Sequence, residues 1–149
     1  MPHRTPDFVR LFDVAAPVER VWDVMSDVER WHEWTASITR VTLNVPGPIA
    51  PGVVGTVKQP KFPPAKWTVT EVVPNAHFIW VTATPGIKCT AFHGVEATPT
   101  GTRVTLSLTY EGALTAPLLW ATRGITEHYL DLEMAGLKAR SEGSAPVTV

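Results

Sequence analysis

The sequence predicts an α+β fold in which two helical regions flank a run of antiparallel strands. Proline placement carries this prediction, because proline is excluded from helix interiors and from central strands. Nine of the 14 prolines lie within 46–99, whereas 18–45 and 118–145 contain none. The proline-free stretches are therefore expected to hold the helices. With 149 residues, the chain has the size of a single domain, 1–149, that can bury its own core.

Composition excludes several classes of protein. The net charge of −1 lacks the basic excess of a general nucleic-acid binder. The single cysteine, Cys89, rules out an internal disulfide and a cysteine-based zinc site. No apolar run approaches the roughly 18 residues of a membrane span, and the first residues hold no signal-peptide core. We expect a cytoplasmic protein without metal or cofactor, either a monomer or a homodimer.

The chain begins with a predicted strand over Phe8–Val14 and a helix that starts at Pro17, since proline suits the first helical position. Ser26 and Glu29 match a capping box, which predicts a break and then a second short helix over 31–34. The first helix has one apolar stripe, formed by Val18, Val21, Trp22, Met25 and Val28.

Between the helices, apolar segments separated by turn residues predict six more strands. The turns are Pro74-Asn75, Pro85-Gly86 and the four-residue loop 98–101. Connections this short indicate an antiparallel meander. The strands are expected at 38–44, 53–58, 67–73, 78–84, 88–97 and 102–111.

Turn length determines strand register, and register determines which side chains face the core. With a four-residue loop at 98–101, His93 lies opposite Leu106. A two-residue turn at 85–86 then places Phe78 opposite His93. The side chains expected to face inward are Phe78, Trp80, Thr82, Cys89, Ala91, His93, Val95, Val104, Leu106, Leu108 and Tyr110.

The next turn back along the chain leaves two registers open. If Pro74-Asn75 is a two-residue turn, then Trp67, Val69 and Glu71 face inward. A loop one residue longer would reverse the face of all three side chains.

The last helix is expected to run from Pro117 to about Glu142. One of its faces is broadly apolar, and Thr122, Thr126 and Glu133 lie near the middle of that face. A carboxylate in such a position is costly unless it is paired, protonated or in contact with water. We therefore expect a solvated or ligand-filled cavity between this helix and the sheet.

Four segments resemble a known superfamily: APVERVWDVMSD at 16–27, WHEW at 31–34, GTRVTL at 101–106 and LKARSE at 137–142. They are similar to segments of the START/polyketide-cyclase-like superfamily, also called SRPBCC. The resemblance implies the helix-grip fold of the birch-pollen allergen, in which a seven-stranded curved antiparallel sheet wraps around a long C-terminal helix. It also implies two short helices after the first strand and a deep cavity for an apolar ligand. Because the superfamily includes cyclases, lipid carriers, hormone receptors, toxins and co-chaperones, the resemblance selects no single function.

Two titratable residues are candidates for catalysis. An inward-facing His93, with an ordinary pKa of roughly 6.5, is suited to general acid or base chemistry. The alternative is a neutral histidine that is hydrogen-bonded to a backbone or hydroxyl partner. Glu133 would have a raised pKa in an apolar cavity and the same possible use. Its alternative is a carboxylate that pairs with Arg140 or reaches water.

The six tryptophans are an excess for a chain of this length. Trp34, Trp67 and Trp80 are expected to face one cavity, whereas Trp22 and Trp31 are expected to pack the first helices. The predicted ligand-binding residues are Trp34, Trp67, Val69, Phe78, Trp80, Ala91, His93, Leu106, Leu108, Tyr110, Thr122, Thr126, Tyr129 and Glu133.

Two further features have no single interpretation. Trp120 falls on the polar face of the last helix, where it covers a loop or marks a contact with another chain. The proline-rich segment 58–66 carries three lysines and Phe62. It is either a solvated loop or a lid that attracts an acidic group of a ligand.

The leading functional hypothesis is a protein that binds a hydrophobic, aromatic or polycyclic small molecule in the cavity. The alternative is an enzyme of the polyketide cyclase or dehydratase type that uses the same cavity, with His93 as acid or base. A third hypothesis is a protein-interaction module, which requires an exposed apolar patch.

Overall fold

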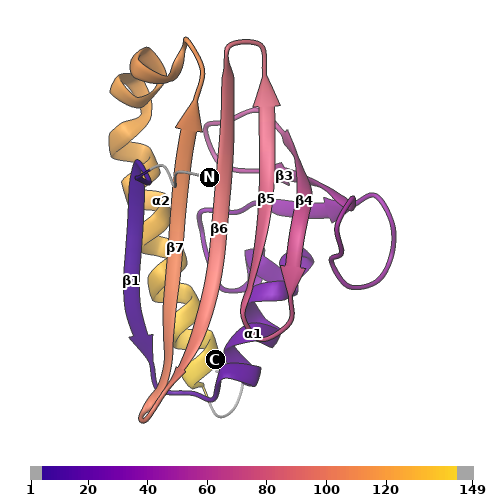
Figure 1. Cartoon of the computed structure of the whole chain (residues 1–149), viewed down its shortest axis with the longest axis vertical. Helices are drawn as coiled ribbons and strands as arrows, with labels where there is room; N and C mark the ends of the chain where they lie inside the picture. The colour runs from indigo at the N-terminus through magenta and orange to yellow at the C-terminus, as the bar shows by residue number, and fades with distance from the viewer. Residues whose placement is uncertain (1–4, 144–149) are drawn as a thin grey trace.

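The computed structural model describes residues 5–143 as a curved antiparallel sheet with a long helix, α2, on its concave side (Figure 1). The sheet has seven strands in the order β1-β7-β6-β5-β4-β3-β2. The predicted α+β helix-grip class is confirmed. The elements are β1 Phe8–Val14, α1 Val18–Ser26, η1 Val28–Glu33 (a 3₁₀ helix), β2 Arg40–Leu43, β3 Val54–Lys58, β4 Ala65–Val73, β5 His77–Thr84, β6 Ile87–Thr98, β7 Gly101–Glu111 and α2 Thr115–Glu142.

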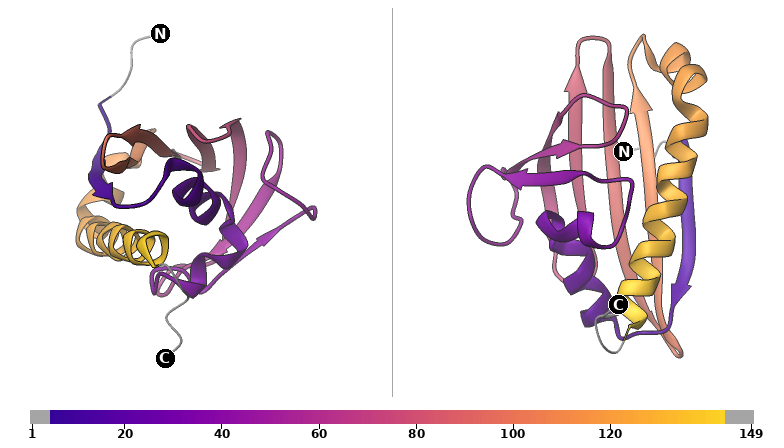
Figure 2. Two further views of the ribbon diagram at one scale, coloured as in Figure 1. Left: turned by 90° about the horizontal axis from the view of Figure 1, so that it is seen from below. Right: turned by 180° about the vertical axis from the view of Figure 1, so that it is seen from behind.

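Strands β2 to β7 follow one another as a meander, and β1 completes the sheet by pairing with β7. Figure 2 shows the sheet curling around α2, with α1 and η1 closing one end. No helix within residues 5–143 is long and apolar enough to cross a bilayer.

The register expected for the long strands is confirmed. His93 pairs with Leu106 across β6 and β7, and Phe78 pairs with His93 across β5 and β6. Thr84 pairs with Ile87 at the two-residue turn. The inward-facing side chains of β5, β6 and β7 therefore lie next to one another on the concave side of the sheet, where the core and the cavity lie.

Strand β4 resolves the register that the sequence leaves open at Pro74-Asn75. The turn before β5 has three residues, because Val73 pairs with His77, and this register places Glu71 on the outer face. A β-bulge then inserts one extra residue between Val69 and Glu71. The bulge returns Val69 and Trp67 to the inner face. Glu71 is exposed and pairs with His77, whereas Trp67 and Val69 face inward.

The predicted capping box does not form at the break between α1 and η1. Helix α1 begins at Val18, after Pro17 as its N-cap, and ends at Ser26. Neither α1 nor η1 has a side-chain cap hydrogen bond. The Glu29 carboxylate instead accepts a hydrogen bond from the backbone N–H of Leu43 at 3.0 Å. Glu29 therefore joins η1 to β2, and the carboxylate does not reach back to Ser26.

The apolar stripe of α1 is buried against the sheet, as its periodicity predicts, with Val18 half-buried. Helix α2 is buried unevenly. Its buried residues are Tyr129, Leu130, Leu137 and Ser141, all in the second half. Leu118 and Leu119, in the first half, are only half-buried. The first half of α2 thus covers open space between helix and sheet, and this space is a cavity.

Candidate functional site

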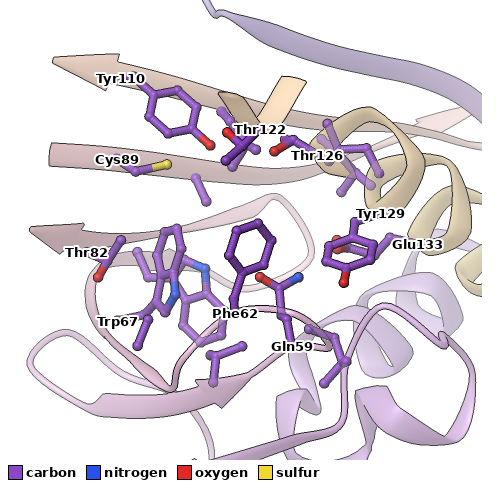
Figure 3. Close-up of a pocket in the computed structure, with 18 of the residues that line it drawn as sticks. Gln59, Phe62, Trp67, Thr82, Cys89, Tyr110, Thr122, Thr126, Tyr129 and Glu133 are labelled. Carbon is purple, nitrogen blue, oxygen red and sulfur yellow. The ribbon is translucent and has the colours of Figure 1, made fainter. Parts of the chain in front are cut away.

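A cavity of about 380 Å³ lies between the concave face of the sheet and α2 (Figure 3). Its volume falls within the roughly 300–1,000 Å³ typical of small-molecule sites. Strands β3 to β7, α2, η1 and the loop between β3 and β4 all contribute to the wall. The wall is mostly apolar, with a few polar side chains among the aromatic and aliphatic ones.

Most of the residues predicted to bind a ligand lie on this wall. They are Trp67, Trp80, Ala91, His93, Leu106, Leu108, Tyr110, Thr122, Thr126, Tyr129 and Glu133. The structure brings them together from four strands and one helix, as the inward register implied.

Three of the predicted residues lie elsewhere. Phe78 and Val69 face inward but are completely covered by other side chains. Trp34 directly follows η1 and packs against α2. Its backbone carbonyl oxygen lies so close to Gly136 of α2 that a Cβ atom there would be only 1.9 Å from it. The side chain that η1 contributes to the cavity is Trp31, which the sequence pattern assigns to packing alone.

Several wall residues are absent from the predicted set. Gln59 and Pro63 lie on the loop between β3 and β4, which has no strand or helix pattern, and Trp31 lies on η1. Phe62, on the same loop, belongs to the segment that the sequence interprets as either a solvated loop or a lid.

Three tryptophans form an aromatic side of the cavity. The Trp80 ring lies 5.7 Å from the Trp67 ring and 5.4 Å from the Trp31 ring, centroid to centroid. The Trp31 indole N–H donates to the Met25 carbonyl at 2.9 Å, which holds the ring in place. Such a surface is suited to stacking against a planar ligand.

His93 is held in an aromatic environment at the cavity wall. Its ring stacks on Phe78 at 4.4 Å, with planes only 4° apart, and lies 5.4 Å from Trp31. Burial lowers the pKa of His93 to about 3, so the imidazole is neutral near neutral pH. Within residues 5–143, the buried Nδ1 atom has no hydrogen-bond partner. A neutral imidazole with such a low pKa is a poor proton donor near neutral pH.

Glu133 lies on the cavity wall at the side lined by Gln59 and Tyr129 (Figure 3). The Ser37 hydroxyl donates to its Oε2 atom at 3.3 Å, and Ser37 in turn lies 2.7 Å from the Thr35 hydroxyl. Burial raises the pKa of Glu133 to about 7, although the Ser37 hydrogen bond lowers it. Glu133 is therefore the cavity group whose protonation changes near neutral pH.

The suggested pairing of Glu133 with Arg140 is wrong. Arg140 donates to Glu33 at 2.7 Å, on η1. Seven residues separate Glu133 from Arg140, so the two side chains leave α2 at different levels. Among residues 5–143, Glu133 forms no ion pair with a basic side chain.

The opposite corner holds Tyr110, Cys89, Thr122 and Thr126 (Figure 3). Burial raises the pKa of Cys89 to about 12, which makes the thiol inert near neutral pH. Burial raises the pKa of Tyr110 as well. The Thr122 hydroxyl donates to the Leu118 carbonyl of its own helix at 2.7 Å. This corner offers neutral hydroxyl groups.

The loop between β3 and β4, residues 59–64, closes part of the cavity. Phe62 packs edge-on against Tyr129 at 6.0 Å, and the Tyr129 hydroxyl donates to the Pro60 carbonyl. The Lys58 ammonium donates to the carbonyl oxygens of Gln59 at 2.7 Å and Phe62 at 2.6 Å. The proline-rich segment is thus a wall of the cavity held by polar contacts.

The family model described as "Polyketide cyclase / dehydrase and lipid transport" matches residues 5–142. The chain belongs to this family. The resemblance to the START/polyketide-cyclase-like superfamily is therefore confirmed. The family description covers both catalysis and transport, which agrees with a site that combines an apolar cavity and few titratable groups.

Several solved structures have the same fold as this family member but low sequence identity to it. A putative uncharacterized protein from Rhizobium leguminosarum has a TM-score of 0.69 at 18% identity, over 91% of this chain and 93% of that one. Ara h 8.0201 has a TM-score of 0.70 at 14% sequence identity, and the match covers 91% of this chain and 97% of that one. The di-domain ARO/CYC StfQ from the steffimycin biosynthetic pathway has a TM-score of 0.68 at 14% sequence identity. That match covers 91% of this chain and 50% of StfQ. A comparison with curated proteins finds no match.

Proposed function

We propose that this chain binds a hydrophobic small molecule with an aromatic or polycyclic body in the cavity between the sheet and α2. The observation that carries the proposal is the row of Trp31, Trp80 and Trp67 along one side of a cavity of about 380 Å³. Aromatic surfaces of this kind bind planar ligands by burial and offset stacking. The few polar groups would orient the ligand.

Binding of the neutral fluorescent probe N-phenyl-1-naphthylamine tests this proposal. We expect saturable binding with a rise in probe emission. Trp67→Ala should weaken the affinity about tenfold, because a stacking surface worth roughly 1–2 kcal/mol is lost. Trp120→Ala is the matched control, since Trp120 is 88% exposed and lies outside the cavity. The absence of saturable binding to a folded protein would overturn the proposal.

A second candidate function is proton-transfer catalysis on a polyketide-type substrate held in the same cavity. The observation that favours it is the pKa of about 7 for Glu133, since an acid or base works best when its pKa is near the working pH. His93, with a pKa of about 3, would serve as a neutral hydrogen-bonding group and not as the acid. The ARO/CYC protein StfQ, which has a similar fold, adds support.

Kinetics of Glu133→Gln would separate catalysis from binding. For an enzyme, the variant should lose about 100-fold or more in kcat on polyketide-type substrates while its affinity for N-phenyl-1-naphthylamine stays within a factor of about three. Undetectable turnover by the wild-type protein on such substrates would contradict the enzyme hypothesis and leave the binding proposal in place.

A further inference from the structure

The described cavity wall holds one side chain that carries a formal charge near neutral pH, and that charge is negative. No lysine or arginine of residues 5–143 is part of the wall. Burial lowers the pKa of His93 and raises the pKa values of Cys89, Tyr110 and Tyr129, so these groups are uncharged. Glu133 is the remaining titratable group of the wall.

The lysines of the proline-rich segment do not change this balance. The Lys58 ammonium is engaged by the carbonyl oxygens of Gln59 and Phe62, at 2.7 and 2.6 Å. Lys61 and Lys66 are exposed, and neither belongs to the cavity wall. The idea that these lysines attract an acidic ligand group is therefore not supported by where their side chains lie.

Three arginines on or against α2 are engaged outside the cavity. Arg10 of β1 pairs with Asp131 at 2.6 Å, and Arg20 of α1 donates to the Arg140 carbonyl at 3.0 Å. Arg140 of α2 pairs with Glu33 at 2.7 Å. Around Glu133, the polar neighbours are hydroxyl and amide groups. Ser37 donates to Glu133, and the Gln59 amide donates to the Ser37 carbonyl at 3.3 Å.

We propose that the cavity selects its ligand by charge: it accepts an aromatic ligand that carries a protonated amine, which Glu133 binds, and it rejects ligands that carry a carboxylate or sulfonate. This inference rests on the proposed binding function and names the ligand class of that same site. An anion placed in the cavity would meet no cation and would lie near a carboxylate, so it would lose its water without compensation. An ammonium would gain a charge-assisted hydrogen bond.

The selectivity should depend on pH in a defined direction. Burial places the pKa of Glu133 at about 7 in the empty cavity, so the fraction of ionised carboxylate grows as pH rises through this value. Affinity for an amine should increase from about pH 6 to about pH 8, and affinity for a carboxylate should decrease. The other titratable groups of the wall, on β6, β7 and α2, stay neutral over this range.

Three ligands with one aromatic body test the inference: 1-naphthylmethylamine, 1-naphthylmethanol and 1-naphthoate. The first is a cation, the second is neutral and the third is an anion across the chosen pH range. Their affinities are measured by displacement of N-phenyl-1-naphthylamine. At about pH 8 we expect the amine to bind at least tenfold more tightly than the acid, with the alcohol between them, and we expect the ratio to shrink at about pH 6.

Glu133→Gln should bring the affinities of the amine and the acid to within about threefold of each other. Glu96→Gln is the matched control, because Glu96 is exposed on β6 and lies outside the cavity wall. It should leave the order of affinities unchanged. The pH series on the unchanged protein gives the same information if Glu133→Gln does not fold.

The outcomes separate this inference from the proposed function. If the alcohol binds but the acid binds as tightly as the amine, charge selection is overturned and the binding function stands. If the probe and the alcohol both fail to bind the folded protein, the binding function is overturned and the inference falls with it. A ratio that does not change between the two pH values also contradicts the role of Glu133.

Discussion

Single residues in this cavity differ from what their type alone implies. Histidine is ordinarily a titratable, polar residue, but His93 lies in the environment of a core aromatic side chain. Its ring stacks on Phe78 with the centroids 4.4 Å apart. Glu133 has the residue type of a surface acid but a pKa of about 7. Burial explains both shifts, because it disfavours the charged form of either group. The same cavity therefore keeps the base neutral and allows the acid to hold a proton.

The raised pKa of Glu133 predicts a pH-dependent stability. Between about pH 4.5 and about pH 7 the unfolded chain releases this proton while the folded chain keeps it. The free energy of unfolding of the wild type should therefore fall with rising pH across this window, relative to Glu133→Gln, by up to about 3 kcal/mol. Urea denaturation at a series of pH values measures it. Equal pH profiles of the wild type and Glu133→Gln would contradict the raised pKa of Glu133. Glu96→Gln is the control, because Glu96 is exposed and its removal should leave the pH profile unchanged.

At the scale of single elements, α2 shows how one residue type can have two roles. Gly124 is exposed, and a Cβ there would meet nothing within 4 Å. A Cβ on Gly136 would lie 1.9 Å from the Trp34 carbonyl oxygen and 3.0 Å from its ring. Gly136 thus permits the close contact between α2 and the chain after η1, whereas no contact explains Gly124.

Alanine substitutions at these two positions should have opposite effects on stability. Gly124→Ala should raise the free energy of unfolding by up to about 1 kcal/mol, because alanine is the better helix former. Gly136→Ala should lower the free energy of unfolding by about 1–3 kcal/mol, because the methyl group would push α2 away from the Trp34 backbone. Chemical denaturation of both variants measures the difference. Similar values at both positions would show that helix α2 does not approach Trp34 so closely.

In strand β4, the length of the adjacent turn does not by itself predict which side chains face inward. Turn lengths correctly placed His93 opposite Leu106 and Phe78 opposite His93. Before β5, a three-residue turn and a β-bulge occur together, and their effects on side-chain direction cancel for Val69 but not for Glu71. The three-residue turn places Glu71 on the outer face, and no residue pattern in β4 indicates the bulge that returns Val69 to the inner face.

At the scale of the whole molecule, the cavity depends on a loop that joins two strands and on the helix that faces it. The 59–64 loop is attached to α2 by the Tyr129 hydroxyl, which donates to the Pro60 carbonyl, and by the contact of Phe62 with the Tyr129 ring. Removing the hydroxyl while keeping the ring isolates the polar contact.

Tyr129→Phe should loosen the 59–64 loop without unfolding the sheet. Loss of one hydrogen bond, worth about 1 kcal/mol, should speed backbone amide exchange in this loop several-fold and should speed ligand dissociation by a similar factor. Hydrogen exchange followed by mass spectrometry and stopped-flow release of the probe measure the two effects. Thr122→Val, which removes a hydroxyl from the same helix away from the loop, should leave loop exchange unchanged. Unchanged exchange in Tyr129→Phe would show that this contact does not hold the loop.

The sequence by itself determined the order of elements, the long-strand register and the inward face of the sheet, because proline exclusion, turn length and strand alternation are local rules. It also identified Glu133 as a costly acid on an apolar helix face. Only the tertiary structure decided which inward residues reach the cavity. Phe78 and Val69 are covered by other side chains, Trp31 takes the place expected for Trp34, and Lys58 is engaged by its own loop. These outcomes depend on how side chains from distant segments fill one space, and no local pattern records that.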